Sequence, residues 1–165
     1  METTARLGMP LIEPGQAQKE MVHNEALTLL DAGVQSSVLA AGVDVPPSVP
    51  VPGQCWIVGH VPEGSWAGNA SSIAVWTEGG WRFLRPTEGW SVWDANTQQV
   101  LRFVAGSWEI GIISARRIVI GGTPVLGAQQ PAVPTPSGGN VIDIEVRRAI
   151  AAMLVALRTH GLIAP

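Results

Sequence analysis

Charged residues, cysteine and lysine are all scarce in this sequence, and each shortage excludes a class of protein. Charged residues make up 14% of the 165 residues, against about a quarter in an average soluble domain. The single cysteine, Cys55, excludes an internal disulfide framework and a cysteine-based zinc cluster, and its apolar neighbours predict a buried, inert thiol. Lys19 is the one lysine and the net charge is −3, so we expect no nucleic-acid binding.

The sequence also lacks a long hydrophobic run. The longest apolar stretch covers residues 149–157, far fewer than the roughly 20 residues that a membrane-spanning helix needs. No secretory signal is visible in the residues that follow Met1. We therefore expect a chain that is synthesised in the cytoplasm and does not insert into a membrane.

Common catalytic signatures are missing as well. The sequence contains no zinc-protease, phosphate-loop or serine-hydrolase motif, and its three histidines lie in three different segments. The glutamates of the central region lie mostly beside glycines, in expected turns, and no pair of carboxylates has the arrangement of a glycosidase. We therefore expect a non-enzymatic protein without a metal ion or a cofactor.

Proline and glycine, by contrast, are plentiful and divide the chain into segments. Repeated proline prevents helix formation and central-strand pairing, so residues 41–52 and 121–139 are predicted to be extended linkers. The remaining segments are predicted to be an N-terminal helical part over 1–40, a β module over 53–120 and a C-terminal helix within 140–165. The predicted fold class is α+β.

The central segment contains all seven tryptophans and both phenylalanines of the chain. Apolar and polar residues alternate between glycine-rich breaks, which predicts a small antiparallel module. Residues 78–80, Glu-Gly-Gly, are the expected turn of a tight hairpin. The predicted strands are residues 55–59, 72–76, 81–84, 91–94, 100–105, 107–112 and 117–120.

A weak repeat occurs inside this module. Residues Val75-Trp76 recur as Val92-Trp93, and Gly80-Trp81 has a counterpart in the sequence Gly-Ser-Trp at 106–108. We interpret the repeat as two aromatic hairpins that share one face and bury their rings together.

Most of the tryptophans are expected to form the core, because one indole ring buries on the order of 200 Å². The alternative role for a tryptophan is a platform on which a sugar ring stacks. Trp66 and Trp90 fit that role best, because each lies in a loop beside glycine rather than in a predicted strand. We therefore name Trp66 and Trp90 as the candidate glycan-stacking residues.

The C-terminal segment has the clearest helical pattern in the chain. Asn140 or Asp143 is placed to cap the helix and Gly161 to end it. Apolar residues follow at steps of four, three and four, which is the spacing of a coiled-coil seam. Because a long linker separates this helix from the β module, we expect the seam to pack against copies of the same chain, with a trimer favoured. The seam residues are Val146, Ile150, Met153 and Leu157.

Three stretches of the chain resemble a known family: residues 10–32, 53–59 and 64–68. They resemble a domain-of-unknown-function family of bacterial prophages and gene transfer agents, in which members are tail-fibre or host-attachment proteins. The ending over residues 147–163 also looks like the tails of such proteins. The family has no established activity or catalytic residues. The resemblance implies a location on a phage-like tail and trimeric assembly.

The expected function is therefore that of a non-enzymatic tail-fibre component that attaches a phage-like particle to the host surface, where it contacts a cell-surface polysaccharide. Its partners are then tail or baseplate proteins and other copies of the chain. Two alternatives stay open: an adaptor that joins a receptor-binding protein to the baseplate, and a tail-associated glycosidase that acts on envelope polysaccharide.

The first helix, predicted from about residue 16 to residue 34 with a bend or frayed end near Gly33, is rich in polar side chains. We interpret six of them as a docking or trimer-packing surface, because their amide and charged groups make directional hydrogen bonds. Simple exposure to water is the alternative. The six residues are Gln16, Gln18, Lys19, His23, Asn24 and Glu25.

Overall fold

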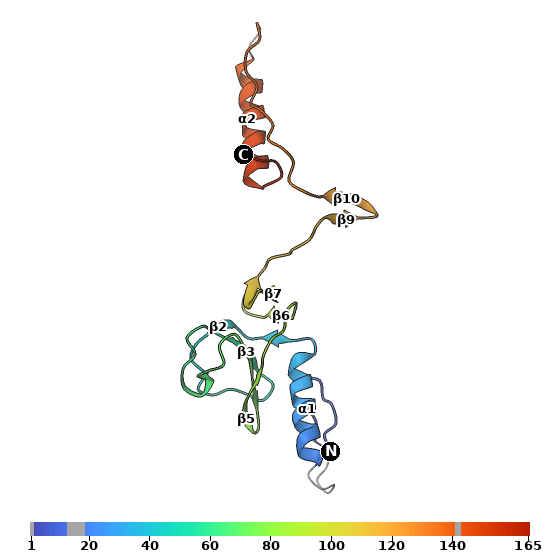
Figure 1. Ribbon diagram of the computed structural model, residues 1–165, viewed down its shortest axis with the longest axis vertical. Coiled ribbons are helices and arrows are strands. Elements are labelled where there is room, and N and C mark those ends of the chain that lie inside the picture. Colours follow the sequence, from blue (N-terminus) through green and yellow to red (C-terminus); the bar gives the residue numbers. More distant parts are fainter. Residues whose placement is uncertain (1, 13–18, 141–142) are drawn as a thin grey trace. The chain divides into compact units, whose positions relative to one another are not determined.

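The computed structural model describes residues 2–12, 19–140 and 143–165, and it divides the chain into two compact units, Met1–Ile112 and Ile113–Pro165. The first unit contains α1 and strands β1 to β8, and the second contains β9, β10 and α2 (Figure 1). The fold is therefore α+β, as predicted. None of the described helices is long and apolar enough to cross a bilayer.

The first unit begins with an arm, residues 2–12, that folds back on itself and is bonded to helix α1 (Lys19–Gly33). Thr3 and Pro10 form an isolated antiparallel bridge inside the arm. The helix ends at Gly33, close to the predicted end, and Ser36 Oγ donates a hydrogen bond to the Gly33 carbonyl at 2.8 Å. Residues 16–18 of the predicted helix lie outside the described residues.

Two four-stranded sheets complete the first unit, with the orders β2-β3-β4-β5 and β1-β6-β7-β8. In each sheet, one short strand from residues 37–43 pairs in parallel with the first strand of a three-stranded antiparallel meander. One segment of seven residues thus joins both sheets. The strands are β1 (Ser37–Val38), β2 (Ala41–Val43), β3 (Cys55–Val58), β4 (Ile73–Thr77), β5 (Gly80–Leu84), β6 (Ser91–Asp94), β7 (Gln99–Val104) and β8 (Ser107–Ile110).

The predicted linker over residues 41–52 is wrong at its start, because Ala41–Val43 is strand β2. Ala41 pairs with Ile57, and Val43 pairs with Val58. These residues precede the first proline of the stretch, so their main-chain N–H groups are free to join a ladder. The following loop is anchored at Asp44, whose Oδ1 accepts a hydrogen bond from the Val61 N–H at 2.8 Å.

The internal repeat corresponds to the two antiparallel meanders. However, Val75-Trp76 lies in the second strand of its meander and Val92-Trp93 in the first strand of the other. Trp81 and Trp108 occupy the third strands, β5 and β8, as expected for counterparts. Their cross-strand partners are Trp76 and Phe103, with ring centroids at 4.9 and 5.2 Å. Trp93 lies in β6 opposite a valine, so the counterpart of Trp76 is Phe103 rather than Trp93.

Side chains along β3 and β4 alternate between two apolar clusters on opposite faces of the sheet. The first cluster joins α1 to both sheets and contains Ala32, Val38, Cys55, Ile57, Ile73, Val75, Val92 and Leu101. The second contains Trp56, Val58, Trp66 and Ala74, with Trp81 and Phe83 packed against it. Trp108 packs against the first cluster and Trp81 against the second, so the two hairpins do not bury their rings together.

The second unit consists of a small hairpin and helix α2 (Ile144–Thr159). The hairpin pairs β9 (Ile118–Ile120) with β10 (Thr123–Leu126), so strand 117–120 belongs to this unit and residues 123–126 are not linker. Gly121 and Gly122 have φ values of 56° and 81°, a turn conformation that glycine adopts without strain. The prediction missed this turn because the prolines and glycines of residues 121–139 were interpreted together as an extended linker.

Helix α2 begins and ends where its predicted capping residues lie. Asp143 Oδ1 accepts a hydrogen bond from the Val146 N–H at 2.9 Å, which satisfies one of the free N–H groups of the first turn. Gly161 follows the helix with a φ of 69°. The chain then turns back, and Ile163 forms a parallel bridge with Gln130.

Candidate functional site

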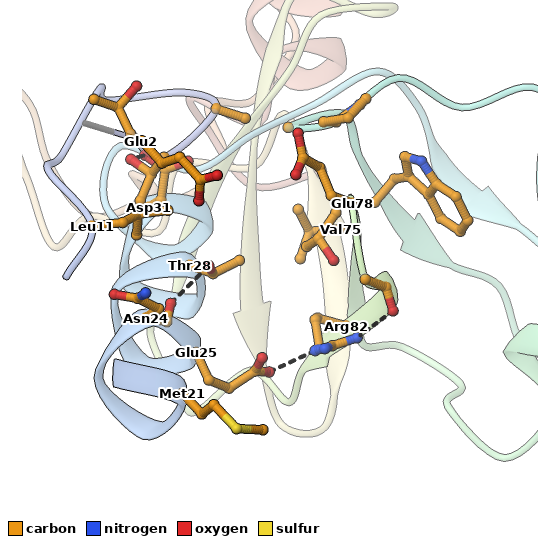
Figure 2. Close-up of a pocket in the computed structure, with 18 residues that line it drawn as sticks. Glu2, Leu11, Met21, Asn24, Glu25, Thr28, Asp31, Val75, Glu78 and Arg82 are labelled. Atoms are coloured by element: carbon orange, nitrogen blue, oxygen red, sulfur yellow. Dashed lines mark hydrogen bonds and ion pairs between the residues drawn. The ribbon is translucent and has the colours of Figure 1, made fainter. Parts of the chain in front are cut away.

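A groove of about 570 Å³ lies in the first unit between the arm, α1 and the β4–β5 hairpin (Figure 2). This volume is in the usual range for small-ligand sites. The charged lining consists of four carboxylates and one guanidinium: Glu2 from the arm, Glu25 and Asp31 from α1, and Glu78 and Arg82 from the hairpin. The groove is therefore acidic.

Asp31 fastens the arm to α1. Its side chain is 4% exposed and accepts hydrogen bonds from Thr4 Oγ1 at 2.8 Å, from the Arg6 N–H at 2.9 Å and from the Leu7 N–H at 2.6 Å. A buried carboxylate is costly unless donors surround it, and hydrogen bonds to an ionised acceptor are stronger than neutral ones. The Asp31 carboxylate therefore has a structural role.

Arg6 of the arm covers the C-terminal end of α1. Its Nη1 donates to the carbonyls of Asp31 at 2.7 Å and Ala32 at 3.1 Å, and its Nη2 donates to the Gln35 carbonyl at 3.0 Å. The last turn of α1 contains no basic residue of its own. The arm thus supplies the positive charge that the exposed carbonyls at a helix C-terminus favour.

Asn24 bonds to the far end of the arm. Its Oδ1 accepts from the Ile12 N–H at 2.9 Å, and its Nδ2 donates to the Ile12 carbonyl at 3.0 Å. The side-chain amide therefore satisfies both main-chain polar groups of Ile12, as a neighbouring strand would. Asn24, one of the six predicted docking residues, thus bonds to the backbone of its own chain.

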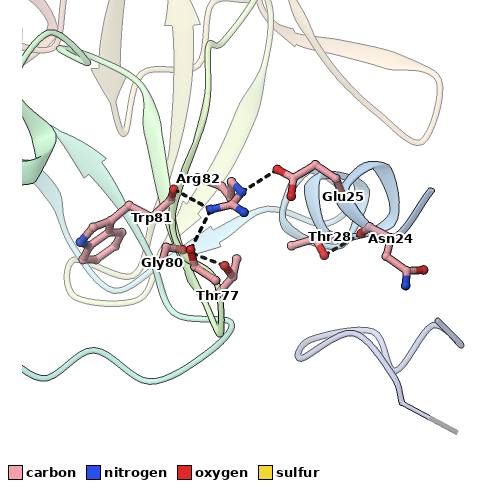
Figure 3. A network of polar contacts seen from close by, with 8 residues as sticks. Asn24, Glu25, Thr28, Thr77, Gly80, Trp81 and Arg82 are labelled. Atoms are coloured by element: carbon pink, nitrogen blue, oxygen red, sulfur yellow. Dashed lines mark hydrogen bonds and ion pairs between the residues drawn. The ribbon is translucent and has the colours of Figure 1, made fainter. Parts of the chain in front are cut away.

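Glu25 and Arg82 connect α1 to the hairpin (Figure 3). Arg82 Nε donates to Glu25 Oε1 at 2.6 Å, and Arg82 Nη1 donates to the carbonyls of Gly79 and Trp81, both at 3.2 Å. Thr77 Oγ1 donates to the Gly80 carbonyl at 2.7 Å and closes the turn from the other side. The hairpin tip is therefore held to the helix.

The six predicted docking residues have different surroundings. Asn24 and Glu25 bond within the chain, as described above. Gln16 and Gln18 lie outside the described residues, as does the side chain of Lys19. His23 is exposed on α1. The docking role of this helix face stays a prediction.

Trp66 is not a stacking platform, and that prediction is wrong. The residue ends the short 3₁₀ helix Gly64–Trp66, and its side chain is 0% exposed. Its ring centroid lies 5.1 Å from that of Trp81 and 6.3 Å from that of Trp56. A ring without an exposed face cannot stack on a sugar. The flanking glycines allow the loop to turn inward, and they do not place its tryptophan outside.

Trp90 is half-buried and packs against the first apolar cluster. Its Nε1 donates to Ser36 Oγ at 3.4 Å, and its ring lies 3.5 Å from the position that a Cβ on Gly33 would occupy. The ring therefore holds the end of α1 near β6, and its stacking role stays a prediction. Trp93, which is not one of the two candidate stacking residues, is more open to solvent, with 45% exposure.

The predicted seam of α2 lies mostly open. Val146, Met153 and Leu157 are 52%, 58% and 37% exposed, and Ile150 is half-buried. Leu154 on the same helix is 6% exposed.

The polar contacts of α2 with the preceding segment come from its arginines. Arg158 Nη2 donates to the Val133 carbonyl at 2.7 Å, and Arg147 donates to the carbonyls of Pro136 and Gly138. The second unit thus covers part of its own helix but leaves most of the seam exposed.

Cys55 is buried in the first cluster, as predicted. Burial raises the pKa of its thiol to about 11 from 9.0, since a thiolate is poorly stabilised away from water; the charge of Arg6 lowers it and that of Asp31 raises it. The thiol is therefore protonated at neutral pH. Within the described residues, no three histidine, cysteine or acidic side chains are grouped to hold a metal ion.

Comparison with protein families identifies the first unit. Residues 23–109, more than half of the chain, match the model of a family described as a protein of unknown function, DUF2793. The match contains most of α1 and nearly all of strands β1 to β8. Residues 10–22 and 147–163, which also carry the resemblance, lie outside it. No curated protein matches the chain. The chain therefore belongs to the DUF2793 family.

Proposed function

We propose that this protein is a structural, non-enzymatic component of a phage-like tail fibre, of a prophage or gene transfer agent, that helps to attach the particle to the host surface. The observation that carries the proposal is the open seam of α2, in which Val146, Met153 and Leu157 are 52%, 58% and 37% exposed. Heptad-like spacing of exposed apolar residues is typical of helices that pack against other helices. Copies of the same chain supply an identical seam and would cover it.

The segment before α2 supports assembly through this helix. All residues from 111 to 140 are exposed, so this stretch has no core of its own. Residues 111–117, between β8 and β9, form no helix or strand, so the second unit can associate with other chains without disturbing the packed β unit. Assembly and surface contact are then separate tasks of the two units.

Two of the four groove carboxylates, Asp31 and Glu25, are poor candidates for glycosidase catalysis, which leaves Glu2 and Glu78 for the activity test below. A glycosidase needs two carboxyl groups that face each other across the sugar and exchange protons or form a bond. Asp31 already accepts three hydrogen bonds, and Glu25 is bonded to Arg82. Both carboxylates are used for structure, so they are poor candidates for either catalytic role.

The assembly part is tested by measuring the mass of the full chain in solution by light scattering. The expected mass is that of three chains, and Met153→Asp combined with Leu157→Asp should reduce it to one. Val155→Asp is the matched control, because Val155 is 59% exposed on the same helix but lies outside the seam. A stable monomer at micromolar concentration would remove this part of the proposal.

The attachment part is tested by labelled electron microscopy of particles from a strain that encodes the protein. A label at the distal end of a fibre supports attachment. A label at the baseplate supports the adaptor alternative instead. Absence of the protein from purified particles would contradict both roles, and release of sugar fragments from envelope polysaccharide would support the glycosidase.

A further inference from the structure

We propose that the groove between the arm, α1 and the β4–β5 hairpin binds a saccharide, with a preference for sugars that carry free amino groups. The inference rests on the attachment role proposed above and names the ligand class of that role. It places the contact with the cell surface in this groove, away from Trp66 and Trp90.

The size and lining of the groove suit a sugar. Its volume of about 570 Å³ accommodates a ligand of one or two rings. The apolar side chains of Leu11, Met21 and Val75 line it together with hydroxyl, amide and carboxylate groups (Figure 2). A pyranose has the same mixed character, because its C–H faces are apolar and its rim carries hydroxyl groups.

The walls of the groove are held in place before any ligand arrives. Asn24 and Asp31 bond to the arm, and Arg82 bonds to α1 and to the hairpin turn. Thr28 Oγ1 donates to the Asn24 carbonyl at 2.8 Å. A site with fixed walls loses little conformational entropy when a ligand binds.

Two carboxylates are left for the ligand. Glu2 on the arm side and Glu78 on the hairpin side both line the groove (Figure 2) and are exposed. Their side chains make no hydrogen bond or ion pair within the described residues. An ionised carboxylate accepts hydrogen bonds and donates none, so a ligand that is rich in donors would best replace the water around these two exposed groups.

The charge of the lining selects among donor-rich ligands. Four carboxylates face one guanidinium, that of Arg82, so an anionic sugar is repelled. An ammonium group donates three hydrogen bonds and carries the complementary charge. Amino sugars should therefore bind more tightly than neutral sugars, and uronic acids least tightly.

A basic peptide would also match the charge, but two main-chain carbonyls at the hairpin tip already have a partner. Peptides that add to a sheet need free carbonyl and N–H groups along a strand. The carbonyls of Gly79 and Trp81 already accept hydrogen bonds from Arg82. The groove thus favours a compact, hydroxyl-bearing ligand over an added strand.

The test is titration calorimetry of the full chain with three probes: a glucosamine trimer with its amines protonated, a neutral glucose trimer and a galacturonic acid trimer. We expect the glucosamine trimer to bind about tenfold more tightly than the glucose trimer, and the uronic acid trimer not to bind. The preference for the glucosamine trimer over the glucose trimer should become smaller at high salt.

Two substitutions test whether the groove is the site. Glu2→Gln and Glu78→Gln should each weaken glucosamine binding by about tenfold while neutral-sugar binding changes little. Glu63→Gln is the matched control, because Glu63 is exposed in another loop and does not line the groove. An equal loss of affinity for the glucosamine trimer in Glu2→Gln, Glu78→Gln and the control Glu63→Gln would overturn the inference. The absence of any saccharide binding would overturn it as well.

A trilysine peptide serves as the competing ligand. Tighter binding of trilysine than of the glucosamine trimer would overturn the saccharide assignment in favour of a peptide. These results are independent of the particle experiments above. Failure of sugar binding leaves the fibre location standing, and absence from particles leaves a saccharide-binding protein without the tail role.

Discussion

Arg82 Nε lies 2.6 Å from Glu25 Oε1, and this pair bridges helix α1 and the β4–β5 hairpin across 57 residues of sequence. The two side chains are 33% and 43% exposed, so solvent weakens their attraction. The pair nevertheless sets the distance between two walls of the groove, because Arg82 is also bonded to the hairpin turn.

Removing this ion pair should cost little stability. Arg82→Gln is expected to lower the free energy of unfolding by about 1 kcal/mol or less, with a smaller loss at high salt. A double-mutant cycle with Glu25→Gln, measured by urea unfolding, isolates the coupling between the two residues. Strict additivity of the two single substitutions would show that the pair contributes nothing.

Asp31→Asn should loosen the arm. The amide keeps the shape of the side chain but turns an acceptor into a donor that faces N–H and O–H donors. The expected loss is about 2–4 kcal/mol in unfolding free energy, together with faster hydrogen exchange at the Leu7 amide, which donates to Asp31 at 2.6 Å. Asp143→Asn is the control, since asparagine caps a helix as well as aspartate does. Unchanged exchange at Leu7 would contradict the role of Asp31.

Trp66→Ala should severely destabilise the first unit. Its ring is fully buried between Trp56 and Trp81, and truncation of a buried tryptophan costs about 3–5 kcal/mol. Trp93→Ala is the matched comparison, because 45% of Trp93 is exposed, and its expected cost is below about 1 kcal/mol. Equal unfolding midpoints in denaturant for the two variants would refute the assigned burial.

Stability should fall in alkaline solution because of Cys55. Its thiol loses its proton at about pH 11 in the folded state, against 9.0 ordinarily, so the folded protein binds the proton more tightly than the unfolded chain. The resulting stabilisation is complete below pH 9.0 and is lost as the pH rises toward about 11, a decline of about 2–3 kcal/mol. Unfolding free energies measured across this range test the sign. Cys55→Ala should flatten the decline, and an unchanged slope would exclude the thiol as its source.

Much of the secondary structure could be predicted because its signals are local. Strand β6 was predicted with its observed bounds, and the other predicted strands were correct to within one or two residues. The cap at Asp143 and the glycine after α2 followed from side-chain chemistry and backbone freedom within a single turn.

The functional residues were harder to predict because exposure is not a local property. Trp66 lies beside glycines in a loop, yet the loop folds inward onto Trp56 and Trp81. The arm gave no periodic signal, since it is held by single side chains such as Asp31 and Arg6. The alternation of apolar and polar residues between glycine-rich breaks could place Glu78 in a turn. It could not show that α1 and the arm lie beside that turn.

The amino-acid sequence by itself determined the two helices and seven of the ten described strands, the capping residues of α2, and how sparse its charge and catalytic motifs are. These properties follow from side-chain spacing and backbone preferences within a few neighbouring residues. The tertiary structure decided that residues 37–43 join two sheets, that Trp66 is buried, and that an acidic groove forms beside α1. Those outcomes depend on contacts between residues far apart in the chain, which no local pattern records.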